Sequence, residues 1–119
     1  MGLKVTHECW NGSCSSFNRW RAKVCEVAGY GNLNERHGFG TLDKKGEIPW
    51  PDDDPLVLLL YHSDCDGDIK HKKCAAIAER LKSLLPAMKV AGPWYYDATL
   101  RWINGLLQAA KLKENVEFS

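Results

Sequence analysis

One stretch predicts much of the shape of this protein: Leu58-Leu59-Leu60-Tyr61-His62-Ser63-Asp64-Cys65-Asp66-Gly67-Asp68-Ile69. In it an apolar run leads directly into three carboxylates, a histidine and a glycine. Asp54-Pro55 lies just before the run and is a typical helix start, because aspartate caps a helix N-terminus and proline fits the first turn. We therefore interpret residues 56–61 as a helix, with a buried strand as the alternative.

The loop that follows has the core features of an EF-hand calcium loop, namely spaced carboxylates, a central glycine and a following isoleucine. If Gly67 is the sixth position of such a loop, His62 is the first and Lys73 the twelfth. Calcium requires carboxylates at both of those positions. The pattern therefore predicts an EF-hand-like helix-loop-helix over residues 55–85 and argues against tight calcium binding.

Apolar spacing and capping residues predict three further helical segments. The first spans residues 15–28, between Ser13 or Ser15 as N-cap and Gly29. The second spans residues 70–85 and ends before Pro86, with residues 88–93 as a connector. The third spans residues 94–113, and Gly105 inside it predicts a close helix contact, because glycine costs a helix about 1 kcal/mol relative to alanine.

Alternating apolar and polar residues predict short strands near both ends of the chain, at residues 3–8 and 115–118. We expect these two strands to pair, with a turn at residues 9–13. Residues 39–42 and 47–50 flank turn-forming residues and predict a small hairpin. The sequence thus predicts a mainly helical α+β fold with about four helices and a small sheet, and residues 1–119 as a single compact domain.

Composition excludes several classes of function. The chain has 119 residues, 16 of them basic and 15 acidic, so its net charge of +1 gives no field for bulk nucleic acid. The longest apolar run, residues 56–61, is far shorter than the roughly 20 residues of a membrane span, and no signal peptide precedes it. We expect a cytoplasmic protein in which the five cysteines are reduced.

Several side chains in and around these segments are suited to binding a small phosphorylated ligand. An aromatic ring can stack on a base, a guanidinium can meet phosphate, and carboxylates can accept from ribose hydroxyls. For any one of them a structural role is the commoner fate, and their concentration is what favours a site. The candidate residues are His7, Trp10, Arg19, Arg21, His62, Asp64 and Asp66.

Three functions follow from these candidates. The first is a binding protein without a cofactor, in which Trp10 stacks on the ligand and Arg19 or Arg21 meets phosphate. The second is a metal-dependent phosphodiester hydrolase that gathers His7, His62, Asp64 and Asp66, although their spacing matches no strong metal motif. The third is an interaction protein whose loop is structural. The sequence leaves open whether the chain forms a homo-oligomer.

Four blocks resemble a group of small uncharacterised proteins of phages, prophages and bacteria: Val5-Thr6-His7-Glu8-Cys9-Trp10, Ser16-Phe17-Asn18-Arg19-Trp20-Arg21, His62-Ser63-Asp64-Cys65-Asp66-Gly67 and Lys113-Glu114-Asn115-Val116-Glu117-Phe118. The resemblance implies a phage context and carries over no catalytic residues. Many small phage proteins act against host defence, some by sequestering nucleotide immune signals. It therefore points to a sponge for a nucleotide-derived signal in the host cell cytosol.

Overall fold

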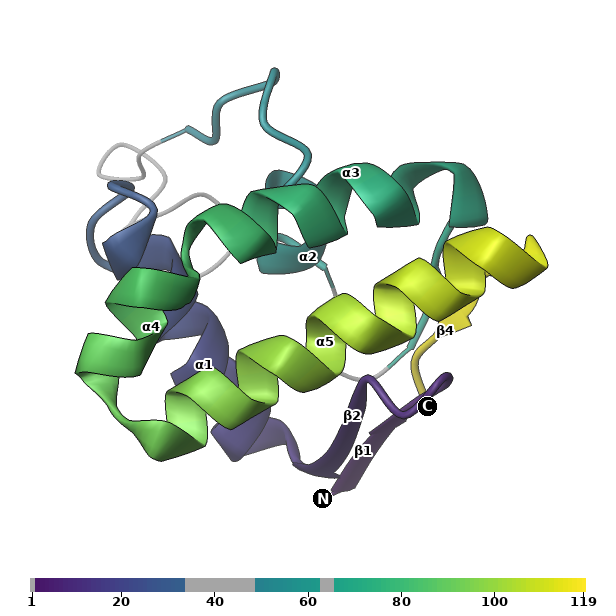
Figure 1. Ribbon diagram of the computed structural model, residues 1–119, viewed down its shortest axis with the longest axis horizontal. Coiled ribbons are helices and arrows are strands. Elements are labelled where there is room, and N and C mark those ends of the chain that lie inside the picture. Colours follow the sequence, from purple (N-terminus) through teal and green to yellow (C-terminus); the bar gives the residue numbers. More distant parts are fainter. Residues whose placement is uncertain (1, 34–48, 63–65) are drawn as a thin grey trace.

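The computed structural model describes residues 2–33, 49–62 and 66–119, and within them the fold is α+β and mainly helical, as predicted (Figure 1). The hairpin predicted at residues 39–42 and 47–50 falls largely outside the described residues, as does Asp64. No helix in the described ranges is long and apolar enough to cross a membrane. The elements in chain order are β1 (Gly2–Val5), β2 (Trp10–Ser13), α1 (Cys14–Val27), α2 (Val57–Leu60), β3 (Asp68–Ile69), α3 (His71–Ser83), α4 (Leu85–Ala91), α5 (Pro93–Leu112) and β4 (Val116–Glu117).

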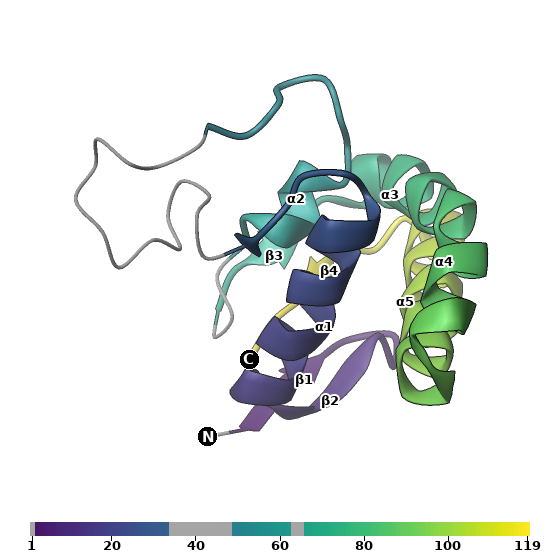
Figure 2. The same ribbon diagram turned by 90° about the vertical axis from the view of Figure 1, so that its left-hand side faces the viewer.

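The two ends of the chain pair with each other, which confirms the predicted pairing of terminal strands. The backbone N–H of Lys4 donates to the carbonyl of Ser119, and the N–H of Ser119 donates back, both at 2.8 Å. An antiparallel bridge joins Val5 to Phe118. The two termini consequently lie close together (Figure 2).

The expected turn at residues 9–13 is wrong, because most of those residues form strand β2. β2 pairs antiparallel with β1, with Val5 opposite Trp10. The chain reverses earlier, where the N–H of Cys9 donates to the carbonyl of Thr6 at 3.3 Å. Burial of the Trp10 ring explains the difference, since an indole that is only 6% exposed is packed inside the core rather than carried on a loop.

The predicted helix after Asp54-Pro55 is present as α2, with Leu59 and Leu60 buried. Oδ1 of Asp54 accepts a hydrogen bond from the N–H of Leu56 at 2.9 Å in the turn that leads into α2, and the N-cap of the helix itself is Leu56. Beyond the loop, Ile69 makes a short antiparallel contact, as an EF-hand isoleucine does, but its partner is Val116 of β4.

The predicted connector at residues 88–93 is wrong, because Leu85–Ala91 form helix α4. Pro86 lies in the first turn of α4. Proline is tolerated there because the backbone N–H that it lacks would have no acceptor within the helix. It therefore begins a new helix as well as following the end of α3. Gly92, with a φ of +141°, separates α4 from α5, and α3, α4 and α5 lie along one side of the molecule (Figure 2).

Aromatic rings from the N-terminal and C-terminal parts of the chain meet in the core. Trp20 of α1 stacks on Trp102 of α5 with centroids 5.4 Å apart and planes at 9°. Phe17 contacts both rings and also lies edge-on to Trp10 and Phe118. Such pairs contribute roughly 0.5–1.5 kcal/mol each beyond the area they bury, so this cluster ties α1, α5, β2 and the C-terminus together.

Gly105 provides the close approach that the sequence predicted, although its partner is not a helix. A Cβ at this position would lie 2.4 Å from Sγ of Cys9 and 2.8 Å from the carbonyl oxygen of His7. The turn between β1 and β2 thus packs directly on the backbone of α5. This contact fixes the position of β2 relative to α5, and the candidate site lies between those two elements.

Candidate functional site

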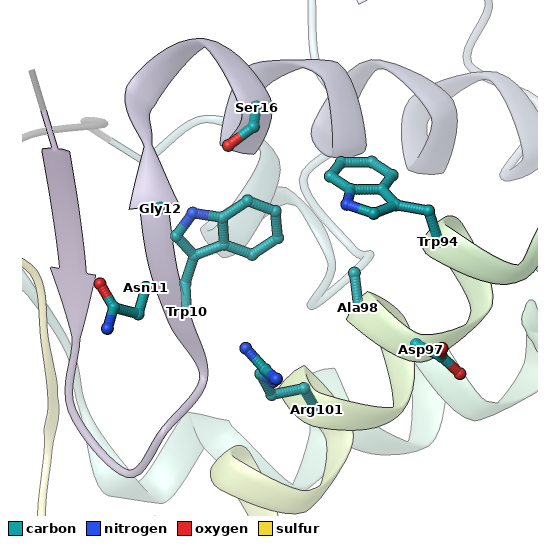
Figure 3. Close-up of a pocket in the computed structure, with 8 residues that line it drawn as sticks. All are labelled: Trp10, Asn11, Gly12, Ser16, Trp94, Asp97, Ala98 and Arg101. Atoms are coloured by element: carbon teal, nitrogen blue, oxygen red, sulfur yellow. The ribbon is translucent and has the colours of Figure 1, made fainter.

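A pocket of about 230 Å³ lies between β2, the first turns of α1 and the N-terminal half of α5 (Figure 3). Of the six candidate residues that the structure describes, Trp10 alone lines it. Figure 3 labels the lining residues, which are Trp10, Asn11, Gly12, Ser16, Trp94, Asp97, Ala98 and Arg101.

Two indole rings form the apolar part of this pocket. Trp10 and Trp94 meet edge to face, with centroids 6.1 Å apart and planes at 89°. Trp10 is held by its contacts with Phe17 and Trp20, whereas Trp94 is 44% exposed. The pocket therefore has one fixed aromatic wall and one wall that remains open to a ligand.

Charged side chains flank the indoles. Asp97 and Arg101 are exposed and lie four residues apart on α5, so they share one face of the helix. The Arg101 side chain extends from α5 toward Trp10 and β2 (Figure 3). A planar ligand lying against the exposed Trp94 ring would meet the Arg101 cation at the same pocket, while the Asp97 carboxylate lies at the outer edge and points away from Trp10 (Figure 3).

The indole N–H of Trp10 is buried and has no hydrogen-bond acceptor among the described residues. It lies beside Gly12, where an added Cβ would be 3.3 Å from Nε1 of Trp10 and 3.3 Å from Oγ of Ser16. Glycine thus keeps this corner of the pocket open. An unsatisfied buried donor costs about 1–3 kcal/mol, which a ligand acceptor reaching it would recover.

A second hollow, of about 680 Å³, adjoins the first on the side of the β1–β2 turn. The two share Trp10, Asn11 and Arg101, and the second is also lined by His7, Glu8 and residues of β1. His7 and Trp10 are therefore the two candidate residues that line this pair of hollows.

His7 is held in place by two neighbours. Its Nε2–H donates to Oε1 of Glu114 at 2.9 Å, and its Nδ1 lies 3.1 Å from the hydroxyl of Thr6. His7 and Glu8 both have a φ of +60°, which is uncommon for residues other than glycine. Backbone strain of this kind is found preferentially at functional sites.

Arg21 and His62 lie together in a different part of the molecule. Arg21, offered by the sequence as a phosphate ligand, is 2% exposed and lines neither hollow. Its guanidinium donates to Oδ1 of Asn18 and to the carbonyls of Leu60 and His62. A cation buried this deeply needs such acceptors, and here they join α1 to the end of α2.

The His62 ring packs against the C-terminus rather than lining either hollow. It stacks on Phe118 with centroids 4.0 Å apart, and its Nε2–H donates to the carbonyl of Asp68 at 2.9 Å. Gly67 lies against the same ring, since a Cβ there would be 3.2 Å from Cε1 of His62. These contacts give His62 and Gly67 a structural role in closing the loop.

The remaining candidates lie elsewhere. Arg19 is exposed on α1 and borders a shallow hollow with Lys23 and Tyr95. Asp66 is exposed at the edge of the loop, and Asp64 is outside the described residues. The structure therefore does not join the seven candidates into one site.

No three His, Cys, Asp or Glu side chains in residues 2–33, 49–62 and 66–119 form a group that could hold a metal ion. Of the cysteines in these ranges, Cys9, Cys25 and Cys74 are buried. Burial raises the pKa of Cys9 to about 12 and that of Cys74 to about 11. At neutral pH both are protonated thiols, which are poor nucleophiles.

Sequence reasoning missed Trp94, Asp97 and Arg101. All three lie in the predicted last helix but off its main apolar stripe, and the spacing of Asp97 and Arg101 placed them on one face. What the sequence did not contain was the position of that face next to β2. No protein-family model, curated protein or solved structure matches the chain.

Proposed function

We propose that this protein binds and sequesters a small nucleotide-derived ligand in the pocket between Trp10 and Trp94, without converting it. The observation that carries the proposal is the pairing of a buried and a half-exposed indole with Arg101 and Asp97 at the same pocket. Aromatic rings accept any nucleobase face, and a guanidinium suits phosphate.

The roles of the side chains follow from their exposure and charge. Trp94 stacks on the base, because it is the open wall, while Trp10 forms the fixed side. Arg101 binds a phosphate, and Asp97 accepts from a ribose hydroxyl or an exocyclic amine. The resemblance of residues 62–67 to small phage proteins supports a setting in the host cytosol, where the protein would withdraw a nucleotide signal from a defence system.

Retention of an intact ligand tests this function. The purified protein is incubated with nucleoside monophosphates, cyclic nucleotides and ADP-ribose, washed and denatured, and the released molecules are identified by mass spectrometry. We expect an intact nucleotide. Recovery of a cleaved product would support the metal-dependent hydrolase instead, and recovery of neither ligand nor product would refute both.

Variants of the pocket test the site. Removing one stacking ring costs about 1–3 kcal/mol, so Trp94→Ala should weaken binding by about 5- to 150-fold. Arg101→Gln should weaken it as well and reduce its salt dependence. Lys89→Gln is the matched control, because Lys89 is an exposed cation on α4 that lines neither hollow.

A further inference from the structure

The two adjoining hollows indicate what kind of nucleotide the site accepts. Pockets for small molecules usually measure roughly 300–1,000 Å³. The pocket between the indoles, at about 230 Å³, is below that range and suits a single ring system. The neighbouring hollow, at about 680 Å³, offers room for a second group of a ligand.

Arg101 lies where the two hollows meet, because it lines both of them together with Trp10 and Asn11. A ligand that occupied both hollows would pass over this guanidinium. Guanidinium binds phosphate, as it binds carboxylate, through two parallel hydrogen bonds. The shared position of Arg101 therefore suits a phosphate link between two halves of a ligand.

The second hollow has the groups to recognise a sugar. Lys4 and Glu8 are exposed at its wall, where they provide an ammonium donor and a carboxylate acceptor for hydroxyls. Glu8 follows His7 in the strained turn with φ of +60°, and Gly105 holds that turn against α5. The donor and acceptor are thus carried by a backbone that packing keeps in one conformation.

On this basis we propose that the ligand is a two-part nucleotide: a nucleoside diphosphate that carries a second sugar ring. The base lies against the exposed Trp94 ring in the pocket that Trp10 also lines, the diphosphate lies at Arg101, and the second ring lies against Lys4 and Glu8. The proposal rests on the proposed function, since it assigns the base to the same pocket. It adds the class of ligand and a second set of specificity residues.

Two graded series of ligands test the proposal by calorimetry: AMP, ADP and ADP-ribose, and GMP, GDP and GDP-mannose. In at least one of the two series, the sugar conjugate should bind at least about tenfold more tightly than the diphosphate, because the linked second group binds at high effective concentration. The double change Lys4→Gln with Glu8→Gln should abolish that gain and leave the affinity for the diphosphate unchanged.

Two results overturn the proposal. If the diphosphate binds as tightly as its sugar conjugate, and Trp94→Ala weakens both, the proposed function stands and the second-ring site is refuted. If no member of either series binds to the folded protein, the proposed function fails as well. Lys4 and Glu8 are both exposed, so circular dichroism and urea unfolding of the double variant should match those of the unmodified protein.

Discussion

Gly105→Ala is predicted to destabilise the protein, although alanine is the better helix former. Gly105 is buried within α5, where the turn between β1 and β2 packs on the helix backbone. In an open helix the substitution would stabilise by about 1 kcal/mol. Here the added Cβ would lie 2.4 Å from Sγ of Cys9 and 2.8 Å from the carbonyl oxygen of His7.

The magnitude follows from which atoms must move. The carbonyl of His7 belongs to a strained turn that is also held by the pairing of β1 with β2, so it has little freedom to retreat. Forcing an extra methyl into a packed site typically costs about 1–3 kcal/mol and occasionally more. At the upper end of that range the cost is about 3 kcal/mol, and the gain of about 1 kcal/mol in helix propensity reduces it. The free energy of unfolding should therefore fall by about 2 kcal/mol.

Urea unfolding followed by tryptophan fluorescence measures this loss. Asn104→Ala is the control, because Asn104 is the exposed neighbour in the same helix and its substitution should be neutral or slightly stabilising. Cys9→Ala combined with Gly105→Ala should show a favourable coupling energy, since it removes the sulfur but not the carbonyl. If Gly105→Ala raised the free energy of unfolding by about 1 kcal/mol, the close contact would be refuted.

Three further predictions concern individual contacts. Thr99→Val removes the acceptor of the buried Trp20 indole N–H, which lies 3.0 Å from Oγ1 of Thr99, and should lower the free energy of unfolding by about 1–3 kcal/mol in urea titration. Burial raises the pKa of Asp54, but hydrogen bonds from Tyr30, the N–H of Leu56 and Arg80 outweigh it and hold that pKa below its ordinary value of 3.8. Ionised Asp54 therefore stabilises the fold at any pH above its ordinary pKa, and this stabilisation is lost as the pH falls through the lower pKa of the folded state. Asp54→Asn should flatten the acid limb of the pH–stability curve. The double change His7→Asn with Glu8→Gly should raise the midpoint of thermal unfolding, because asparagine and glycine suit two successive positive φ angles. The same variant should bind the sugar conjugate more weakly.

Each of these outcomes can fail in a recognisable way. An unfolding free energy unchanged in Thr99→Val would mean that the Trp20 N–H finds another acceptor. An acid limb as steep in Asp54→Asn as in the unmodified protein would show that other carboxylates control the acid response. A turn variant that is less stable than the original would contradict the assignment of strain to His7 and Glu8.

Local signals were sufficient for most of the elements. The Asp54-Pro55 cap identified α2, apolar spacing identified α1, α3 and α5, and alternation identified the terminal strands. These signals depend on neighbouring residues alone, which is why one sequence contains them. The error at Pro86 arose because proline both ends one helix and begins another, and only packing of Met88 in the core decides that the chain continues as α4.

The site depended on contacts that no local signal contains. The sequence offered Arg21 as a phosphate ligand, yet the carbonyls of Leu60 and His62, about forty residues away in sequence, hold it inside. His62 is held by Phe118 at the other end of the chain. Neither partner could be inferred from spacing, because these contacts exist only after α1, α2 and the C-terminus have packed together.

The sequence by itself indicated the helical α+β character through caps and periodicity, suggested that the two terminal strands pair, and marked Gly105 as a close approach without giving its partner. Only the tertiary structure decided where the chemistry lies. It left His62 and Arg21 in structural roles, and it brought Trp10 of β2 next to Trp94 and Arg101 of α5. That pocket exists because the missing side chain of Gly105 lets the β1–β2 turn rest on the helix.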